Sequence, residues 1–218
     1  RFGVFFGDGY FMFVGGSGTF LSSSDGTTWT SRTSGTSDGL LGVTYGNNTF
    51  VSVGDSGTIL TSSDGTTWTS ITSGTTIHLQ GVTYGNGTFV TVGHTGTILT
   101  SSDGTTWTSR TSGTSGNLQG VTYGNGLFVS VGDGGTILTS PDGTTWTSRT
   151  SGTSYGLGGK TYGNGTFVTV GESGTILTSP DVVTWTSRTS GTSDKISEVT
   201  HRNSTFLTVG DNGKIRLH

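Results

Sequence analysis

The side chains of this chain that could do chemistry are carboxylates and imidazoles. Its 218 residues include 13 Asp and Glu, four His and no Cys, so thiol catalysis and disulfides are excluded. Two carboxylates at a matched separation can hydrolyse a glycosidic bond, and clustered His and carboxylate groups can hold a metal. The chemistry therefore depends on whether the sequence gathers these groups at one point.

The spacing of the charged residues argues against an active site. Five Asp recur at intervals of 39 residues: Asp25, Asp64, Asp103, Asp142 and Asp181. Four Arg share another equivalent position, which Ile71 takes in the second repeat: Arg32, Arg110, Arg149 and Arg188. Groups that follow a repeat are distributed over the molecule, so no asymmetric acid/base pair stands out. We predict a protein without catalytic residues.

Two further groups have weak alternatives. His78 and His94 fall in one repeat, and a two-His metal site is open to them, but no HExxH motif supports it. We predict no metal and no cofactor. The segment Gly159-Lys160-Thr161 is like part of a phosphate loop, but position 154 is Ser where that motif needs Gly. Lys160 lies on a predicted strand, where it either lines a central channel or extends its ammonium group to water.

The elements that must position these residues come from one repeated unit. The five tryptophans are 39 residues apart: Trp29, Trp68, Trp107, Trp146 and Trp185. A fixed period between 20 and 50 residues indicates a repeat architecture. We place the repeats at approximately 1–39, 40–78, 79–117, 118–156 and 157–195, with a partial repeat at 196–218, all within a single domain of residues 1–218.

Each unit predicts four short strands. In the repeat at 81–119 they are expected at 82–84, 88–92, 97–101 and 107–111, because β-branched and aromatic residues fill these runs while Gly, Asn and Asp fill the turns. Asn86-Gly87 is a strong hairpin signal, since both central positions of a type I′ turn need φ > 0. Four antiparallel strands make a blade, and blades around an axis make an all-β propeller. An open β-solenoid is the alternative.

The copy number predicts six blades. The first three strand positions recur six times and the Trp-containing fourth recurs five times, so the last blade is expected to be three-stranded. In a closed ring the first blade neighbours the sixth. Phe5, Met12 and Phe13 differ from the equivalent residues of the other repeats. They either fill space at this closure seam or form an apolar patch for a partner or a second copy.

The turn before each tryptophan, such as Ser62-Ser63-Asp64-Gly65-Thr66-Thr67-Trp68, resembles the Asp-box, or bacterial neuraminidase repeat, with one residue fewer between Asp and Trp. The whole unit resembles the repeats of photosystem II assembly-factor-like propellers. The resemblance implies a structural box, in which Asp accepts backbone N–H bonds and Trp packs between blades. The residues given this role are Asp25, Trp29, Asp64, Trp68, Asp103, Trp107, Asp142, Trp146, Asp181 and Trp185.

The differences between repeats indicate a candidate binding face. In an up-and-down blade, the loops joining strands 2 and 3 open on the same face as the connections between blades, and these two sets vary most. Acidic, amide, imidazole and aromatic groups gather there, and the bland alternative is drift in tolerant loops. The candidate ligand-binding residues are Asp38, Asp55, His78, Gln80, His94, Asn117, Gln119, Asp133, Tyr155, Glu172, Asp194 and Asp211.

Composition narrows the partners. Charged residues make up 11% of the chain and the net charge is -3, which gives no basic footprint for nucleic acid and no apolar run for membrane insertion. We predict a non-enzymatic recognition module that binds carbohydrate multivalently, located outside the cell or at its surface. The alternatives are a protein-interaction or scaffold propeller, an engineered scaffold with no selected ligand, and a glycosidase.

Overall fold

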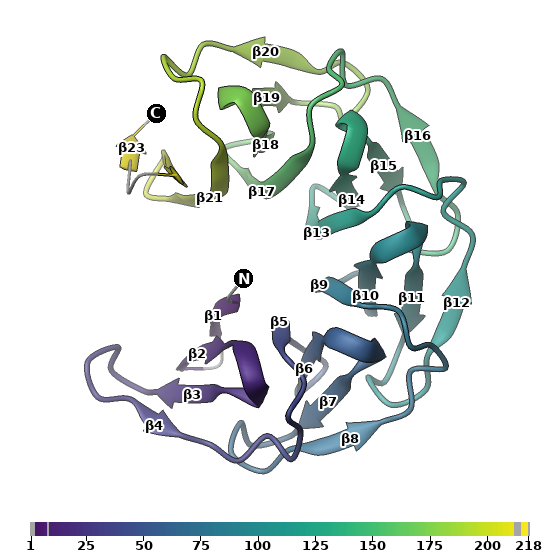
Figure 1. The fold of residues 1–218 in the computed structure, drawn as a ribbon, viewed down its shortest axis with the longest axis vertical. Helices are drawn as coiled ribbons and strands as arrows, with labels where there is room; N and C mark the ends of the chain where they lie inside the picture. The colour runs from purple at the N-terminus through teal and green to yellow at the C-terminus, as the bar shows by residue number, and fades with distance from the viewer. Residues whose placement is uncertain (1–2, 8, 212–214, 218) are drawn as a thin grey trace.

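The computed structural model describes residues 3–7, 9–211 and 215–217. These residues form 23 strands in six antiparallel sheets, five with four strands and one with three. Each sheet is a blade, and the blades follow one another around a central axis (Figure 1). The predicted six-bladed propeller with a three-stranded last blade is confirmed.

The strands of a blade run outward from the axis in chain order. The innermost strands are β1 (Gly3–Gly7), β5 (Leu40–Gly46), β9 (Leu79–Gly85), β13 (Leu118–Gly124), β17 (Leu157–Gly163) and β21 (Ile196–Arg202). The second strands are β2 (Tyr10–Val14), β6 (Thr49–Gly54), β10 (Thr88–Gly93), β14 (Leu127–Gly132), β18 (Thr166–Gly171) and β22 (Thr205–Gly210).

The outer half of each blade is shorter. The third strands are β3 (Phe20–Ser23), β7 (Ile59–Ser62), β11 (Ile98–Ser101), β15 (Ile137–Ser140), β19 (Ile176–Ser179) and β23 (Ile215–Leu217). The outermost strands are β4 (Thr30–Ser31), β8 (Thr69–Ile71), β12 (Thr108–Arg110), β16 (Thr147–Arg149) and β20 (Thr186–Arg188). Single 3-10 turns join strands 2 and 3: η1 (Gly16–Gly18), η2 (Asp55–Gly57), η3 (His94–Gly96), η4 (Asp133–Gly135) and η5 (Glu172–Gly174).

The hairpins follow from local chemistry. Asn86 and Gly87 have φ values of 46° and 75°, so the Asn-Gly pair makes the turn with two positive φ angles that joins β9 to β10. Thr88 then pairs with Gly85, and Phe89 with Tyr84. The register puts alternate side chains on opposite faces of the blade.

The hydrophobic core consists of a cluster between each pair of neighbouring blades, and the two blades contribute different residues to it. One half comes from strands 2 and 3 of a blade, such as Val90, Val92 and Ile98 of blade 3, and we call this side the valine face. The other half comes from the next blade, and we call it the tryptophan face. In blade 4 that face consists of Leu118, Val121, Tyr123, Phe128, Leu138 and Trp146.

The ring is open between blades 1 and 6. Inner strands contact each other in sequence from β1 to β21, and Figure 1 shows the ribbons of β1 and β21 apart. Val4 and Phe6 on β1 are 69% and 63% exposed. The closure-seam prediction is wrong for Met12, which is fully buried between blades 1 and 2, and for Phe5, which packs on the same cluster. Phe13 pairs with Val4 and is half-buried on the face toward the open side, where no blade closes the ring.

Candidate functional site

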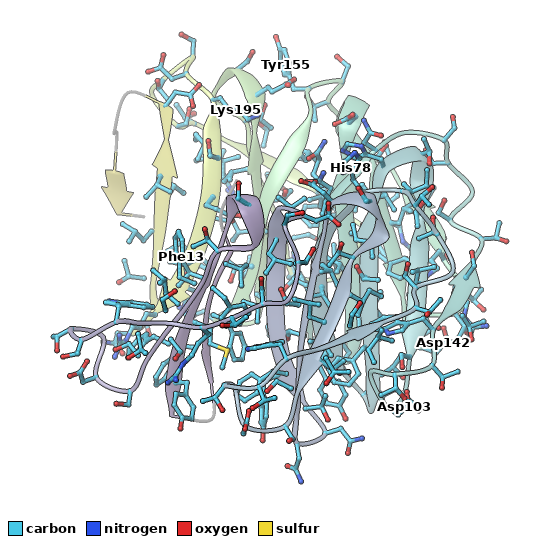
Figure 2. The ribbon with its side chains drawn as sticks, turned by 60° about the horizontal axis from the view of Figure 1, so that its bottom comes forward. Phe13, His78, Asp103, Asp142, Tyr155 and Lys195 are labelled. Atoms are coloured by element: carbon cyan, nitrogen blue, oxygen red, sulfur yellow. The ribbon has the colours of Figure 1, made fainter. Side chains whose placement is uncertain are left out.

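The variable loops predicted to form a binding face lie together at one end of the blades. The 3-10 turns bond to the connections between blades, as when the N–H of His94 donates to the carbonyl of His78 at 3.0 Å. Figure 2 shows His78 and Tyr155 at one end of the blades and Asp103 and Asp142 at the other. The variable loops therefore open on the face opposite the Asp-box turns.

On blades 2 and 3 the candidate residues bond to each other. The Nδ1 of His78 lies 2.8 Å from Oδ1 of Asp55, and Nε2 of Gln80 lies 2.9 Å from Nε2 of His94. The two imidazole centroids are 5.2 Å apart. Among the described residues, no group of three or more His, Asp or Glu could hold a metal ion.

Blade 4 has a second network. Asp133 accepts hydrogen bonds from Nδ2 of Asn117 at 3.0 Å and from Nε2 of Gln119 at 2.8 Å. The N–H of Thr95 in blade 3 donates to Oδ1 of Asn117 at 3.0 Å. The Asn117 side chain therefore joins blade 3 to blade 4, and both Asp133 oxygens already have donors.

The remaining candidates are single contacts. Asp38 accepts a bond from the Thr58 hydroxyl at 2.9 Å, and Glu172 accepts one from the Gly156 N–H at 3.0 Å. The hydroxyl of Thr192 donates to Asp194 at 3.2 Å, and the backbone N–H of Asp211 donates to the Lys195 carbonyl at 2.9 Å. Tyr155 is 49% exposed. The structure thus places the twelve candidates around one face and pairs many of them locally, rather than gathering them in one pocket.

The Asp-box turns are closed by their own backbone. Oδ1 of Asp103 accepts the N–H groups of Thr105 and Thr106 at 2.8 Å each and the Ser101 hydroxyl at 2.9 Å. These donors, first the backbone N–H of Thr106 and then that of Thr105, hold the pKa of the Asp103 carboxyl well below its ordinary value. The carboxylates of Asp25, Asp64, Asp142 and Asp181 accept equivalent backbone bonds. A carboxylate used in this way stabilises a turn.

The most distinctive surface is the open side of the central channel. Sequence reasoning offered an apolar patch on blade 1 as one alternative and named Gln80 and Gln119, which line this side, but it missed Val4, Phe6 and the blade 6 residues. A cavity of about 760 Å³ is bounded by inner-strand residues from every blade and includes Val4, Phe6, Glu198, Leu207 and Val209. It also includes Lys160, so this residue lines the channel. Aligning the repeats could have found these residues. Val4 and Phe6 align with Val43 and Tyr45 of blade 2, which pack against the preceding blade, and blade 1 has no preceding blade in the chain.

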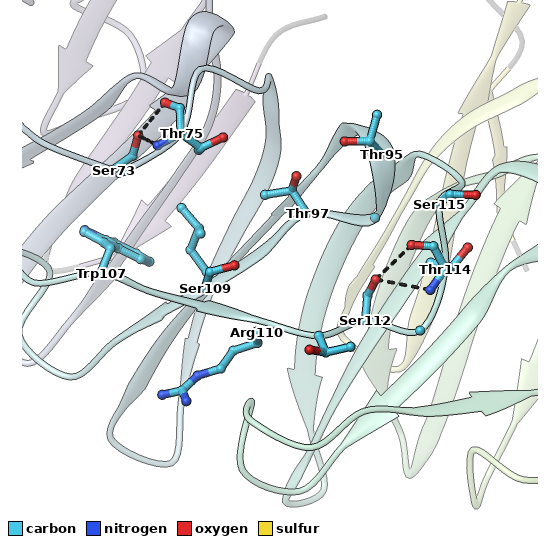
Figure 3. Close-up of a pocket in the computed structure, with 15 residues that line it drawn as sticks. Ser73, Thr75, Thr95, Thr97, Trp107, Ser109, Arg110, Ser112, Thr114 and Ser115 are labelled. Atoms are coloured by element: carbon cyan, nitrogen blue, oxygen red, sulfur yellow. Dashed lines mark hydrogen bonds between the residues drawn. The ribbon is translucent and has the colours of Figure 1, made fainter.

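Two shallow grooves lie on the outer rim. One, of about 640 Å³, runs between blades 2 and 3 and is lined by Trp107, Arg110 and hydroxyls such as Ser109 and Thr97 (Figure 3). The other, of about 700 Å³, is lined by Ser56 to Thr58 and by 70–76, the residues one repeat earlier. The grooves are therefore related by the 39-residue period.

No protein family model and no curated protein matches the chain. Solved structures do. YCF48 bound to a D1 peptide is 20% identical with a TM-score of 0.78 over 100% of this chain and 76% of its own. YCF48 from Cyanidioschyzon merolae is 15% identical, with a TM-score of 0.51, over 99% of this chain and 93% of its own. The computationally designed Ika8 protein is 13% identical, with a TM-score of 0.77, over 99% and 69%.

These similarities establish the fold. They agree with the resemblance to photosystem II assembly-factor-like propellers, while the Asp-box likeness stays a resemblance of turn sequences. In the part of the chain that the structure describes, no helix has the length and apolar character needed to cross a bilayer. The chain is thus similar in fold to YCF48. At this low sequence identity, the exposed residues of each blade are best compared with the equivalent residues of the other blades.

Proposed function

We propose that this chain is a non-enzymatic propeller that recognises protein through the open side of its ring. The observation that supports this most directly is the tryptophan face of blade 1. Its described residues are Val4, Phe6, Phe11, Leu21 and Trp29. In blade 2 the residues equivalent to Val4, Phe6 and Trp29 pack against blade 1: Val43 is buried, and Tyr45 and Trp68 are half-buried. In blade 1, Val4, Phe6 and Trp29 are 69%, 63% and 41% exposed.

A contiguous apolar face of this kind is typical of a protein interaction site. Phe6 and Phe11 stack with their ring centroids 4.4 Å apart, so the face offers an ordered aromatic surface. Aromatic anchors of this type dominate the binding energy of protein interfaces. Across the cavity lie Leu207 and Val209 of blade 6, and Val209 is 38% exposed.

The same evidence disfavours an enzyme. The repeated Asp carboxylates close their own turns, and their hydrogen bonds favour permanent ionisation over proton transfer. A similar fold in YCF48, whose structure holds a D1 peptide, is a further reason to prefer a polypeptide partner. Because propellers serve many functions, the main support for the proposal is the exposed tryptophan face of blade 1.

A peptide-display selection tests this proposal. Random 12-residue peptides would be selected on the intact chain, and the enriched sequences measured against a Phe6→Ser/Trp29→Ser variant. We expect apolar peptides whose affinity falls by about tenfold or more in that variant. The matched control is Tyr155→Ser, which removes an exposed aromatic from the other surface and should leave affinity unchanged. Enriched peptides that bind all three proteins equally, or no enrichment, would contradict the proposal.

Carbohydrate binding is the second candidate, and the groove between blades 2 and 3 favours it. Its hydroxyls, Arg110 and the indole of Trp107 suit hydrogen bonding and stacking to a sugar ring. Arg110→Ile copies the side chain that the second repeat carries at this position. On a glycan array, a saccharide signal lost in Arg110→Ile but kept in Phe6→Ser would assign binding to the groove between blades 2 and 3. Absence of any signal would remove this candidate. A location outside the cell stays a prediction from sequence.

A further inference from the structure

We infer that the occupant of the open side is a second copy of this chain, whose blade 6 packs head-to-tail on blade 1. The inference rests on the proposed function, because it uses the same apolar surface. It goes further by naming the partner and the orientation of the contact.

The interior interfaces supply the argument, since each one joins a valine face to the tryptophan face of the next blade. Between blades 3 and 4, Val90, Val92 and Ile98 meet Leu118, Phe128 and Leu138. Between blades 4 and 5, Val129, Val131 and Ile137 meet Leu157, Phe167 and Leu177 in the same way. The two halves are different surfaces, and neither is used to pack against itself.

Each end of the open ring presents one uncovered half. Blade 1 exposes the tryptophan face, described above. Blade 6 exposes the valine face, on which Leu207 and Val209 take the positions of Val90 and Val92. Leu207 is half-buried and Val209 exposed, while Val90 and Val92 are fully buried. A second copy therefore brings the complement of each free half, and the contact continues an interface that the ring already contains five times.

The innermost strand explains how this contact differs from an interior one. A Cβ on Gly42 would lie 3.2 Å from the Cα of Gly81, so the inner strands of adjacent blades approach through residues without side chains. In blade 6 this position is Glu198, which is exposed. Its side chain lies where the inner strands of two blades come closest, so it weakens the contact between the two copies without removing the packing of Val4 and Phe6. Glu198→Gly should therefore strengthen self-association.

Sedimentation velocity over a range of concentrations is the first measurement. We expect reversible association, weakened by about tenfold or more in Phe6→Ser and strengthened in Glu198→Gly. Val183→Ser is the matched control, because Val183 is 57% exposed on the Asp-box turn of blade 5, and it should associate like the unchanged chain. The inference is overturned if both the unchanged chain and Glu198→Gly stay monomeric at every concentration.

Cysteine pairing tests the orientation, because the chain has no Cys of its own. Val4→Cys and Val209→Cys would be prepared separately and mixed under oxidised glutathione. The head-to-tail contact predicts a disulfide-linked dimer in the mixture and none above the Val183→Cys background in either protein alone. Dimers of Val4→Cys alone would overturn the head-to-tail arrangement. If the chain is strictly monomeric but peptides still bind the Phe6 surface, this inference is wrong and the proposed function is supported.

Discussion

The indole of Trp68 packs against the ring of Phe20 in the preceding blade, with ring centroids 4.2 Å apart. The tryptophan of blade 2 thus packs on the hydrophobic cluster between its own blade and the preceding one. Trp29 takes the same position in blade 1, where it is 41% exposed. One repeated residue thus has two roles, and only its place in the ring decides which.

The first prediction compares two equivalent phenylalanines. Phe89 is fully buried and lies 4.6 Å from the Tyr84 ring, centroid to centroid, so Phe89→Ala should cost about 3–5 kcal/mol and lower the Tm by roughly 10 °C. Phe11→Ala changes the same position on the open side and should cost less than half as much. The comparison is made by thermal denaturation at concentrations where the chain is monomeric, since a second copy would cover Phe11. Equal losses under those conditions would contradict the exposure of the blade 1 face.

A second prediction concerns acid. Backbone donors lower the pKa of Asp103 in the folded protein, so this carboxylate stabilises the fold above its unfolded pKa of about 3.9. That contribution is lost as the pH falls toward the lowered folded value. Asp103→Asn should reduce the Tm at pH 7, and its difference from the unchanged chain should narrow between about pH 4 and pH 2. Parallel Tm curves over that range would refute the assignment.

A third prediction asks whether the polar residues of the variable face bind a ligand or stabilise the loops. Asp133→Ala removes the acceptor for Asn117 and Gln119, and it should destabilise the protein by about 0.5–1.5 kcal/mol. Chemical denaturation measures this loss. Asp133 does not line the channel cavity and makes no contact with Phe6 or Trp29 of the proposed surface, so peptide affinity should not change. A large loss of affinity with unchanged stability would return the binding site to the variable face.

The fourth prediction uses the irregular box of the fifth repeat. Val182 has φ = 59° and stands where Gly104 has φ = 78°, so a β-branched residue is held in a left-handed conformation that costs about 1–2 kcal/mol. Val182 is also buried in the core between blades 4 and 5, which returns about as much. Val182→Gly should therefore change the free energy of unfolding by less than about 1 kcal/mol.

Gly104→Val is the reverse substitution and should be more harmful. An added Cβ there would lie 3.2 Å from a Val51 methyl group, so steric overlap adds to the left-handed strain. We expect a loss of roughly 2 kcal/mol or more by chemical denaturation. If the two substitutions have equal effects, the fifth blade has not repacked around its valine.

The repeat itself determined most of the fold. Period-two strands, Asn-Gly turns and a 39-residue spacing are local properties, so they predict the strand order and the number of blades without any tertiary information. The same reasoning placed the variable residues on one face, because alternate loops of an up-and-down blade must open at the same end. Lys160 in the channel follows from its inner-strand position, which the sequence allowed as one of two alternatives.

Whether the ring closes is a property that only the tertiary structure decided. Closure depends on the angle between neighbouring blades, which small contacts such as those between Gly42 and Gly81 set and the ring accumulates over its whole circumference. No local pattern encodes that sum. Met12 and Phe5 lie on the face toward blade 2 because the strand register places them with Val14. The exposure of Phe6 and Trp29, by contrast, depends on the open ring and became visible only in three dimensions.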